Sequence, residues 1–516
     1  MTNSYWLLAL LVVPLVGAAV VMLVPKANEK LAKQLALVIS LVVFGLTLAM
    51  CGQFVVSRAA EFQFTYSVSW ISSYDINFAL GVDGIALVLI ALSASLVPVV
   101  LLAGWHDADG ARGSVRGYVA LILVLEAAMV GVFAATDLFL FYVFFEAMLV
   151  PVYFLIGRYG GPRRNYAAVK FLLYSLFGGL LMLASLIGLY VVSGDITGHG
   201  TFDFTQLAGL ADQIAPDTQK WLFAGFFIAF AIKAPLVPFH TWLPDAAAES
   251  TPGTAVLLVG VLDKVGTFGM LRYCLELFPG ASHWATPLVI VLAVVGIIYG
   301  ALQAIGQSDI KRLIAYTSVS HFGFIALGVF VMTTQGQSGS ALYMVNHGFS
   351  TAALFLIAGF LISRRGSRLV DDFGGVQRVA PVLAGTFLLA GLSSLALPGL
   401  SSFVSEFLVL VGTFERYTWV GVVATLGIVL AALYILLMYQ RTMTGPTPDV
   451  VTEKVHDLRG REVLAIAPLL VVIVALGFYP KPVLDVVNPA VDRVMHAVGA
   501  TDPAPQVAPV AEGTAK

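Results

Sequence analysis

The chain has 516 residues, of which 59% are hydrophobic and only 11% are charged, and its mean hydropathy is +0.92. A soluble domain has about 25% charged residues, so this composition excludes that class and indicates a polytopic helical membrane protein. The formal net charge of −2 comes without a basic run or an acidic tail, and we expect no nucleic-acid partner.

Cys51 and Cys274 lie far apart in apolar stretches and are expected to be packing residues. No HExxH, GxGxxG or Walker lysine loop is present, which argues against zinc and nucleotide enzymes.

Apolar segments of about 20 residues, the length that crosses a bilayer, follow one another along the chain. The first begins at Tyr5 and lacks the basic region and cleavage site of a signal peptide, so we count it as a membrane helix. The sequence predicts an all-α polytopic membrane protein of about 14 transmembrane helices. Their expected ranges, in chain order, are 5–24, 32–56, 84–104, 116–135, 137–157, 166–192, 221–239, 253–276, 286–304, 310–332, 341–362, 382–411, 419–440 and 463–483. The last thirty or so residues, rich in Pro and Ala, are expected to be a disordered tail.

Basic residues are distributed unequally between the two sets of connections. The connections from odd- to even-numbered helices hold 18 of the 28 lysines and arginines, and the opposite connections and the tail hold six. Lysine and arginine near helix ends are retained on the cytoplasmic side. We therefore expect an even number of helices, with both termini on the outer side of a bacterial cell membrane.

Two predicted helices contain proline near the middle of the span. In the seventh helix Pro235 follows Lys233, and in the twelfth Pro398 precedes Glu406. Proline removes a backbone donor and clashes with the preceding turn, so both helices should be broken. Broken backbone in a bilayer is tolerated only where it is buried in protein or lines a wet cavity. Paired broken helices are typical of inverted-repeat transporters, and we expect two inverted five-helix repeats.

These repeats divide the chain into four parts. They are helices one to three in 1–115, the first five-helix repeat in 116–280, the second, inverted repeat in 281–441, and helix fourteen with a short polar tail in 442–516. The halves show no visible sequence identity, so the repeat is inferred from the positions of the breaks.

A few ionisable residues lie inside the predicted spans, where an unpaired charge costs several kcal/mol. Lys233 and Lys264 lie near the midplane, and the acids are Glu126, Glu146 and Glu406. Buried acids and bases are driven toward neutrality unless they pair, and we expect Glu146 to pair with Lys233. A static salt bridge between two helices is the alternative, but it leaves Lys264 and Glu406 unexplained.

Two histidines complete the polar series inside the spans. His321 and His347 lie among Ser, Thr, Asn and Tyr side chains, which can hold the ordered waters of a proton wire. Histidine exchanges protons near neutral pH, so we expect a relay, with a simple interhelix hydrogen bond as the alternative. Asp263 adjoins Lys264 but points about 100° away around a helix, so we expect it to be structural.

Three segments carry a family resemblance: FFEAMLVPVYFLIG, then AIKAPLVPFHTWLPDAAAESTPGTAVLLVGVLDKVGTFGMLR, then LPGLSSFVSEF. They resemble the antiporter-like subunits of bacterial proton-translocating NADH:quinone oxidoreductase, respiratory complex I. The likeness extends over essentially the whole chain. The same family includes large subunits of multisubunit cation/proton antiporters and membrane-bound hydrogenases. Glu406 is typical of the M-type members, because the sister subunits L and N have lysine there.

The resemblance implies proton translocation coupled to electron transfer in other subunits, with no redox chemistry, cofactor or metal in this chain. FMN, iron–sulfur clusters and quinone are expected in partner subunits. The expected partners are the lipid bilayer and other membrane-arm subunits, especially L and N. The relay residues that the resemblance implies are Lys233, Glu146, Lys264, Glu406, His321, His347 and Glu126. A subunit of a cation/proton antiporter of the same fold is the alternative function.

Overall fold

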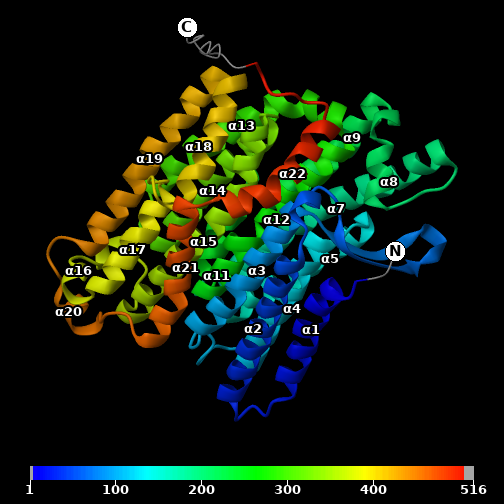
Figure 1. Cartoon of the computed structure of the whole chain (residues 1–516). Coiled ribbons are helices and arrows are strands. Elements are labelled where there is room, and N and C mark those ends of the chain that lie inside the picture. The colour runs from blue at the N-terminus through cyan, green and yellow to red at the C-terminus, as the bar shows by residue number, and fades with distance from the viewer. Residues whose placement is uncertain (1–3, 505–516) are drawn as a thin grey trace, which may run out of the picture.

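The apolar segments form long helices that run side by side through the molecule (Figure 1). The computed structural model describes residues 4–504, and the end of the predicted tail, 505–516, lies outside the described residues. Within 4–504, twelve helical segments are long and apolar enough to cross a membrane. They are α1 (Trp6–Leu23), α2 (Glu29–Gln53), α3 (Gly84–Ala103), α4 (Val115–Ala134), α5 with α6 (Leu138–Tyr159), α7 (Arg164–Thr197), α11 through α12 (Pro252–Leu275), α13 (Pro279–Ile305), α14 (Ile310–Phe330), α15 (Thr334–Arg365), α19 (Thr418–Met443) and α21 (Gly460–Phe478).

Two of these segments are not regular α-helices throughout. The fifth consists of α5 (Leu138–Ala147) and α6 (Leu149–Tyr159). The segment Pro252–Leu275 alternates α- and π-helical turns. Its parts are α11 (Pro252–Leu257), a π turn (Leu258–Leu262), α12 (Lys264–Gly269) and a second π turn (Met270–Leu275).

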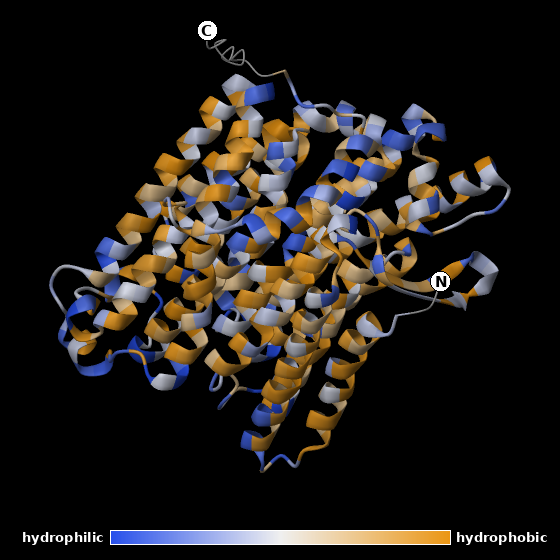
Figure 2. Cartoon of the chain, in the orientation of Figure 1, coloured by the Kyte–Doolittle hydropathy of each residue, from blue (hydrophilic) through white to orange (hydrophobic). Residues whose placement is uncertain are grey.

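The remaining helices do not cross on their own. They are α8 (Phe204–Gly209), α9 (Pro216–Lys233), α10 (Trp242–Glu249), α16 (Val376–Val379), α17 (Pro381–Ser394), α18 (Ser401–Arg416), α20 (Asp449–Lys454) and α22 (Lys481–Ala497). Figure 2 shows apolar residues along most of the bundle and hydrophilic residues concentrated in the connections, with further polar positions in the interior. The most buried spans are the π-containing segment, α14 and α15, so these three form the centre of the bundle.

The connection between α2 and α3 forms a β-hairpin, so the all-α prediction is incomplete. Strand β1 (Gln63–Ile71) pairs antiparallel with β2 (Ile76–Val82). Its sequence, QFTYSVSWI, alternates aromatic or β-branched residues with polar ones, a pattern that suits a half-buried strand. The backbone N–H of Asn77 donates to the Asp137 carboxylate at 2.9 Å, which joins the hairpin to the connection between α4 and α5.

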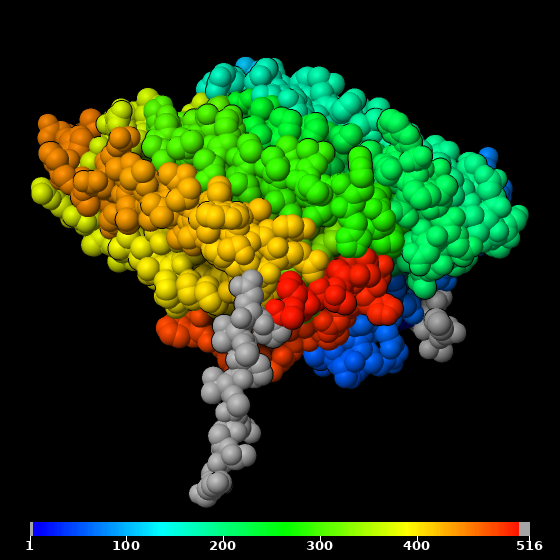
Figure 3. Space-filling view, turned by 90° about the horizontal axis from the view of Figure 1, so that it is seen from above, coloured from blue at the N-terminus to red at the C-terminus, as the bar shows by residue number. Residues whose placement is uncertain are grey.

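The prediction of a disordered tail is wrong for the first part of that tail, because Lys481–Ala497 forms helix α22. Its buried residues recur at helical spacing and include Val487, Val491 and Val494, so one face packs against the bundle. Figure 3 shows α22, in red, lying across this face of the molecule beside the blue N-terminal part of the chain.

The connections that hold most basic residues meet at one end of the bundle, which we call the basic end. Lys33 and Asp109 form an ion pair at 2.6 Å, which joins the start of α2 to the α3–α4 connection. The latter connection also accepts a backbone N–H from the start of α11. Arg368 pairs with Glu249 at 2.9 Å, which joins the segment after α15 to the end of α10.

A buried ion cluster fastens α22 at the opposite end, which we call the far end. Asp83, at the start of α3, lies 2.5 Å from Arg272 and 2.8 Å from Arg493 of α22. Arg493 also pairs with Glu276 at 3.0 Å. Three segments from distant parts of the chain are therefore joined by one set of charges.

Both described ends of the chain lie at the far end. The N–H of Ser4 donates to the carbonyl of Thr65 in β1 at 2.8 Å. The carboxylate of Asp502 accepts the N–H of Thr334, at the start of α15, at 2.8 Å. The chain therefore traverses the bundle an even number of times.

Candidate functional site

Lys233 is the last residue of α9, and the sequence explains why the helix ends there. Pro235 has no backbone N–H to continue the helical hydrogen bonds. The carbonyl of Ile232 accepts the indole N–H of Trp242 at 2.9 Å, so α10 supplies a donor that the helix no longer provides. A cation at a helix C-terminus is favoured by the helix dipole.

The Lys233 ammonium is enclosed by aromatic rings. The side chain is 0% exposed, and among the described residues Nζ has no hydrogen-bond partner. It lies 4.6 Å from the ring centroid of Phe145 and 5.9 Å from that of Phe171. The negative faces of these rings attract the cation but replace only part of its hydration.

Glu146 lies one residue beyond Phe145 on α5, and it is partly exposed. Its carboxylate faces α7 at Gly179, where a β-carbon would collide with one oxygen. Among the described residues, Glu146 and Lys233 do not form an ion pair within 4.0 Å, although the two charges interact electrostatically. The expected pair is therefore a through-space interaction in this structure and not a direct contact.

Lys264 lies two residues beyond the end of the first π turn, and its ammonium has two close partners. Nζ is 2.5 Å from the carbonyl oxygen of Val259 and 2.7 Å from Nδ1 of His347. The ring of Phe322 lies 5.1 Å away. In a π turn each carbonyl bonds to the N–H five residues on and not four, so the regular hydrogen-bond ladder of the helix is interrupted. The carbonyl of Val259 can therefore accept a hydrogen bond from Lys264.

Asp263 is a member of this site that the sequence analysis treated as structural. Both carboxylate oxygens are buried without a hydrogen-bond partner among the described residues, and the group interacts electrostatically with Lys233 and Lys264. The angle of about 100° between neighbours assumes a regular helix, and here a π turn ends directly before Asp263. Helix α12 approaches α9 closely because residue 266 is glycine, where a β-carbon would lie 2.5 Å from the nitrogen of Ala234.

The two histidines lie next to each other between α14 and α15. The ring centroids of His321 and His347 are 5.2 Å apart and the rings are nearly perpendicular. Nε2 of His321 lies 3.2 Å from the hydroxyl of Tyr434. Nε2 of His347 and Nδ1 of His321 have no hydrogen-bond partner among the described residues. Both rings therefore retain a nitrogen that can exchange a proton.

Glu406, on α18, is 3% exposed and accepts a hydrogen bond from the hydroxyl of Tyr343 at 2.7 Å. The Tyr343 ring lies 5.9 Å from that of His321. Side chains from α12, α15, α14 and α18 thus follow one another across the interior. We call this set the central row, and its members are Lys264, His347, His321, Tyr343 and Glu406.

Two further buried groups lie outside the central row. Glu126, which the sequence analysis included in the relay, is 0% exposed on α4, and neither oxygen has a hydrogen-bond partner among the described residues. His240, which the sequence analysis did not select, is 3% exposed between α9 and α10, and its ring lies 5.1 Å from that of Tyr299. Its position two residues after Pro238, in VPFH, was the signal in the sequence.

The fold and the central row define a class: a polytopic membrane protein with ionisable side chains aligned through its interior. Residues 135–431 match the family model described as NADH:quinone oxidoreductase/Mrp antiporter, TM. The NADH-quinone oxidoreductase subunit M of Mycobacterium tuberculosis is 53% identical, over 98% of this chain and 97% of the relative. This chain therefore belongs to the NADH:quinone oxidoreductase/Mrp antiporter family.

Solved structures show the same fold. A chain of respiratory complex I from Thermus thermophilus superposes with a TM-score of 0.86 and 31% sequence identity, over 96% of this chain and all of that chain. A chain of the Mrp complex from Dietzia superposes with a TM-score of 0.82 at 22% identity, over 96% of this chain and all of that chain, which shows the shared fold alone.

Proposed function

We propose that this chain is the M-type proton-translocating subunit in the membrane arm of a bacterial NADH:quinone oxidoreductase. The central row carries the proposal, because it places a lysine, two histidines, a tyrosine and a glutamate in sequence through the most buried part of the bundle. Ionisable groups in this position are expensive, and they commonly form proton relays. The 53% identity to a subunit M of an NADH-quinone oxidoreductase supports the electron-transfer complex over the antiporter alternative.

Protons would pass along the central row by exchange between neighbouring groups. His347 contacts Lys264 at 2.7 Å, and the buried nitrogens of the two histidines that have no hydrogen-bond partner among the described residues would be joined by a bridging water. Tyr343 joins this region to Glu406, which would release the proton toward the far end. The direction follows from the expectation that the basic end is cytoplasmic.

Lys233, Asp263 and Glu146 would control this relay electrostatically. Moving one charge across a membrane costs about 2.3 kcal/mol per 100 mV. Two charges 4 Å apart interact by about 4 kcal/mol at an effective dielectric constant of 20. A change in the charge of Asp263, which interacts with both lysines, would therefore alter the proton affinity of Lys264 by an amount comparable with the work of pumping. Glu146 is partly exposed on α5, so it would transmit the change to a neighbouring subunit, L or N.

We infer fourteen crossings, of which the seventh combines α9 with α10 and the twelfth combines α17 with α18. Residue Gln219 of α9 accepts the N–H of Ala281 at the far end, whereas Glu249 of α10 lies at the basic end. The start of α17 bonds to Asp457 near the basic end, and α18 ends at Arg416. The interruptions would be the counterparts in two inverted five-helix repeats, 116–280 and 281–441, flanked by 1–115 and 442–516.

The remaining parts of the proposal concern the assembly. Both termini would face the outer side of the bacterial cell membrane, because the basic end is retained in the cytoplasm. FMN, iron–sulfur clusters and quinone would be bound by partner subunits, so that this chain contributes proton transfer only. Glu126 would belong to the relay as a group that gains a partner during turnover.

The test is to replace Lys264 with methionine in the assembled complex and to reconstitute the complex in liposomes. We expect NADH-driven proton uptake to fall by at least about tenfold while NADH oxidation by an artificial acceptor stays unchanged. Lys220→Met, at a partly exposed lysine that pairs with Asp217 on its own helix, is the control and should pump normally. Normal coupled pumping by Lys264→Met would overturn the proposal.

A further inference from the structure

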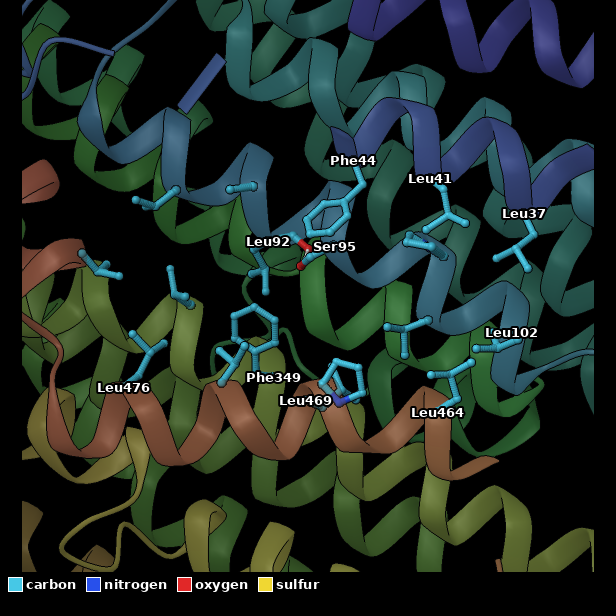
Figure 4. A pocket seen from close by; sticks show the side chains of 18 residues that line it. Leu37, Leu41, Phe44, Leu92, Ser95, Leu102, Phe349, Leu464, Leu469 and Leu476 are labelled. Carbon is cyan, nitrogen blue, oxygen red and sulfur yellow. Dashed lines mark hydrogen bonds between the residues drawn. The ribbon is translucent and has the colours of Figure 1, made fainter. Parts of the chain in front are cut away.

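An apolar groove runs along the outside of the bundle between α3 and α21 (Figure 4). It has a volume of about 620 Å³. The α3 wall is a single stripe at helical spacing, with Val88, Ala91, Ser95 and Leu102 among its members. Helix α21 forms the facing wall, α2 adds a third side, and Phe349 of α15 lies at the base. Apart from Ser95, the residues that line the groove are apolar.

A second cavity, of about 800 Å³, continues from one end of this groove. On α3 the groove ends at Leu102, and the next two residues, 103 and 104, line the second cavity. On α21 the groove begins at Leu464, and Arg461 and Glu462 before it line the second cavity. Figure 4 shows Leu102 and Leu464 facing each other at the same end of the groove. The two cavities therefore share their walls end to end.

The second cavity carries an excess of positive charge. Four lysine or arginine side chains line it against two carboxylates, which are Asp107 and Glu462. Glu462 is neutralised by Arg364 at 2.6 Å. Among the described residues, Lys454 and Arg461 have no carboxylate within 4.0 Å, and the buried Nη1 of Arg461 has no hydrogen-bond partner. The cavity thus presents cations whose charges the protein itself does not fully compensate.

We propose that these two cavities together form a binding site for one anionic phospholipid, with an acyl chain in the groove and the phosphate group beside Lys454 and Arg461. The site is distinct from the central row. Basic pockets next to an apolar surface at the lysine- and arginine-rich side of a membrane protein match the chemistry of anionic lipid headgroups.

The groove is long enough for an acyl chain. From Leu102 to Val88 the α3 wall covers fourteen residues, which is about 21 Å at the rise of an α-helix. One leaflet of hydrocarbon is about 15 Å thick, so a chain anchored at the basic end would lie in the groove over the full depth of its leaflet. A transmembrane helix of a partner subunit would have no use for the cationic cavity at one end.

The first measurement is mass spectrometry of the intact complex, purified in detergent with equimolar phosphatidylglycerol and phosphatidylcholine of the same chain length. We expect this subunit to be released with one phosphatidylglycerol, in at least about tenfold preference over phosphatidylcholine. The double variant Lys454→Gln with Arg461→Gln removes the headgroup contacts, and Ala91→Trp fills the groove. Each should lower the retained phosphatidylglycerol by about tenfold.

Matched controls distinguish these effects from a general change of charge or surface. Lys30→Gln with Arg112→Gln removes two exposed charges at the basic end outside both cavities. Val38→Trp adds the same ring at an exposed position of α2 outside the groove. Both controls should retain phosphatidylglycerol as the unmodified complex does. Equal retention of the two lipids, or full retention in the cavity variants, would overturn the proposal.

A photoreactive residue at Leu41, which lines the groove and is 49% exposed, gives a test that leaves both cavities' charges intact. Irradiation of membranes should attach a phospholipid to this subunit. An adduct with another polypeptide would instead show that a protein helix fills the groove, and the lipid site would be rejected.

Discussion

Single buried side chains in this protein are left with fewer hydrogen bonds than their charge requires. Lys233, Asp263 and Glu126 have polar atoms without any hydrogen-bond partner among the described residues. Such groups cost free energy in the resting fold, and a static structural role would select paired groups or apolar ones instead. Their cost is understandable if each group acquires a proton or a partner during turnover.

Tyr343 lies between the histidines and Glu406 in the central row, because its hydroxyl donates to Glu406 at 2.7 Å and its ring lies 5.9 Å from that of His321. Tyr343→Phe removes one oxygen and preserves the ring. A hydrogen bond to a charged group contributes about 1.5–3 kcal/mol, so we expect NADH-driven proton translocation to fall roughly tenfold or more. Proton uptake by reconstituted complex, divided by NADH oxidation with an artificial acceptor, measures this change.

Tyr273→Phe is the matched control for this substitution. Tyr273 is 1% exposed and packs among aromatic rings, but its hydroxyl makes no hydrogen bond within the described residues. We expect pumping close to normal in this variant. If Tyr343→Phe pumps as well as the Tyr273 control, Tyr343 is a packing residue and Glu406 must receive protons by another route.

The residues of the site were largely predictable from the sequence, whereas their contacts were not. Charges and histidines inside apolar spans identify Lys264 and His347, because such groups are costly in a bilayer and commonly mark a proton or ion path there. Their contact joins positions 83 residues apart and depends on how α12 and α15 pack. The interaction of Asp263 with both lysines was not expected, because the local rule for neighbouring helical residues fails beside a π turn.

Helices that cross the bilayer were easier to predict than the elements at its surface. A run of about 20 apolar residues has a clear signal, but the hairpin formed by β1 and β2 is short and half-polar. Helix α22 was also difficult to predict, because it contains Pro489 and only a narrow stripe of its surface is apolar. Its position is fixed by distant charges that no local pattern reveals.

Arg493 tests whether that ion cluster holds α22 in place. Its guanidinium pairs with Asp83 at 2.8 Å and Glu276 at 3.0 Å, and its side chain is 25% exposed. Arg493→Gln leaves two buried carboxylates with one remaining arginine, and breaking such a pair costs about 3–5 kcal/mol when it is fully buried. We expect amide hydrogen exchange over residues 481–497 to accelerate by at least about tenfold.

The same helix offers a control for this measurement. Within residues 4–504, Lys481 pairs only with Asp485, four residues along α22, and the lysine side chain is 63% exposed. Exposed pairs of this kind contribute about 1 kcal/mol or less, so Lys481→Gln should leave the exchange nearly unchanged. Equal protection of 481–497 in Arg493→Gln and the unmodified protein would mean that apolar packing alone holds α22.

The molecule as a whole has two chemically different ends, and the central row lies between them. The basic end gathers connections from throughout the chain through ion pairs such as Lys33 with Asp109. The far end holds the hairpin, α22 and both described chain ends. Sequence alone predicts this polarity through the unequal distribution of lysine and arginine, because 18 of the 28 basic residues fall in the odd-to-even connections.

Accessibility of introduced cysteines gives the orientation directly. Cys51→Ser serves as the background, because the remaining cysteine, Cys274, is buried. Ser72→Cys then places a thiol in the hairpin, and Lys30→Cys places one at the basic end. A membrane-impermeant thiol reagent should label the hairpin cysteine in right-side-out vesicles and the Lys30 position only in inverted ones.

Asp502→Cys tests whether the number of crossings is even, because an even number places this residue on the same side as the hairpin. Labelling of positions 72 and 502 from opposite sides would imply an odd number of crossings, and one of the interrupted segments, α9 with α10 or α17 with α18, would then fail to span. Labelling of both from the cytoplasmic side would preserve the fold but reverse the direction in which Glu406 releases protons. The background variant without an added cysteine should remain unlabelled, which shows that each signal comes from the introduced thiol.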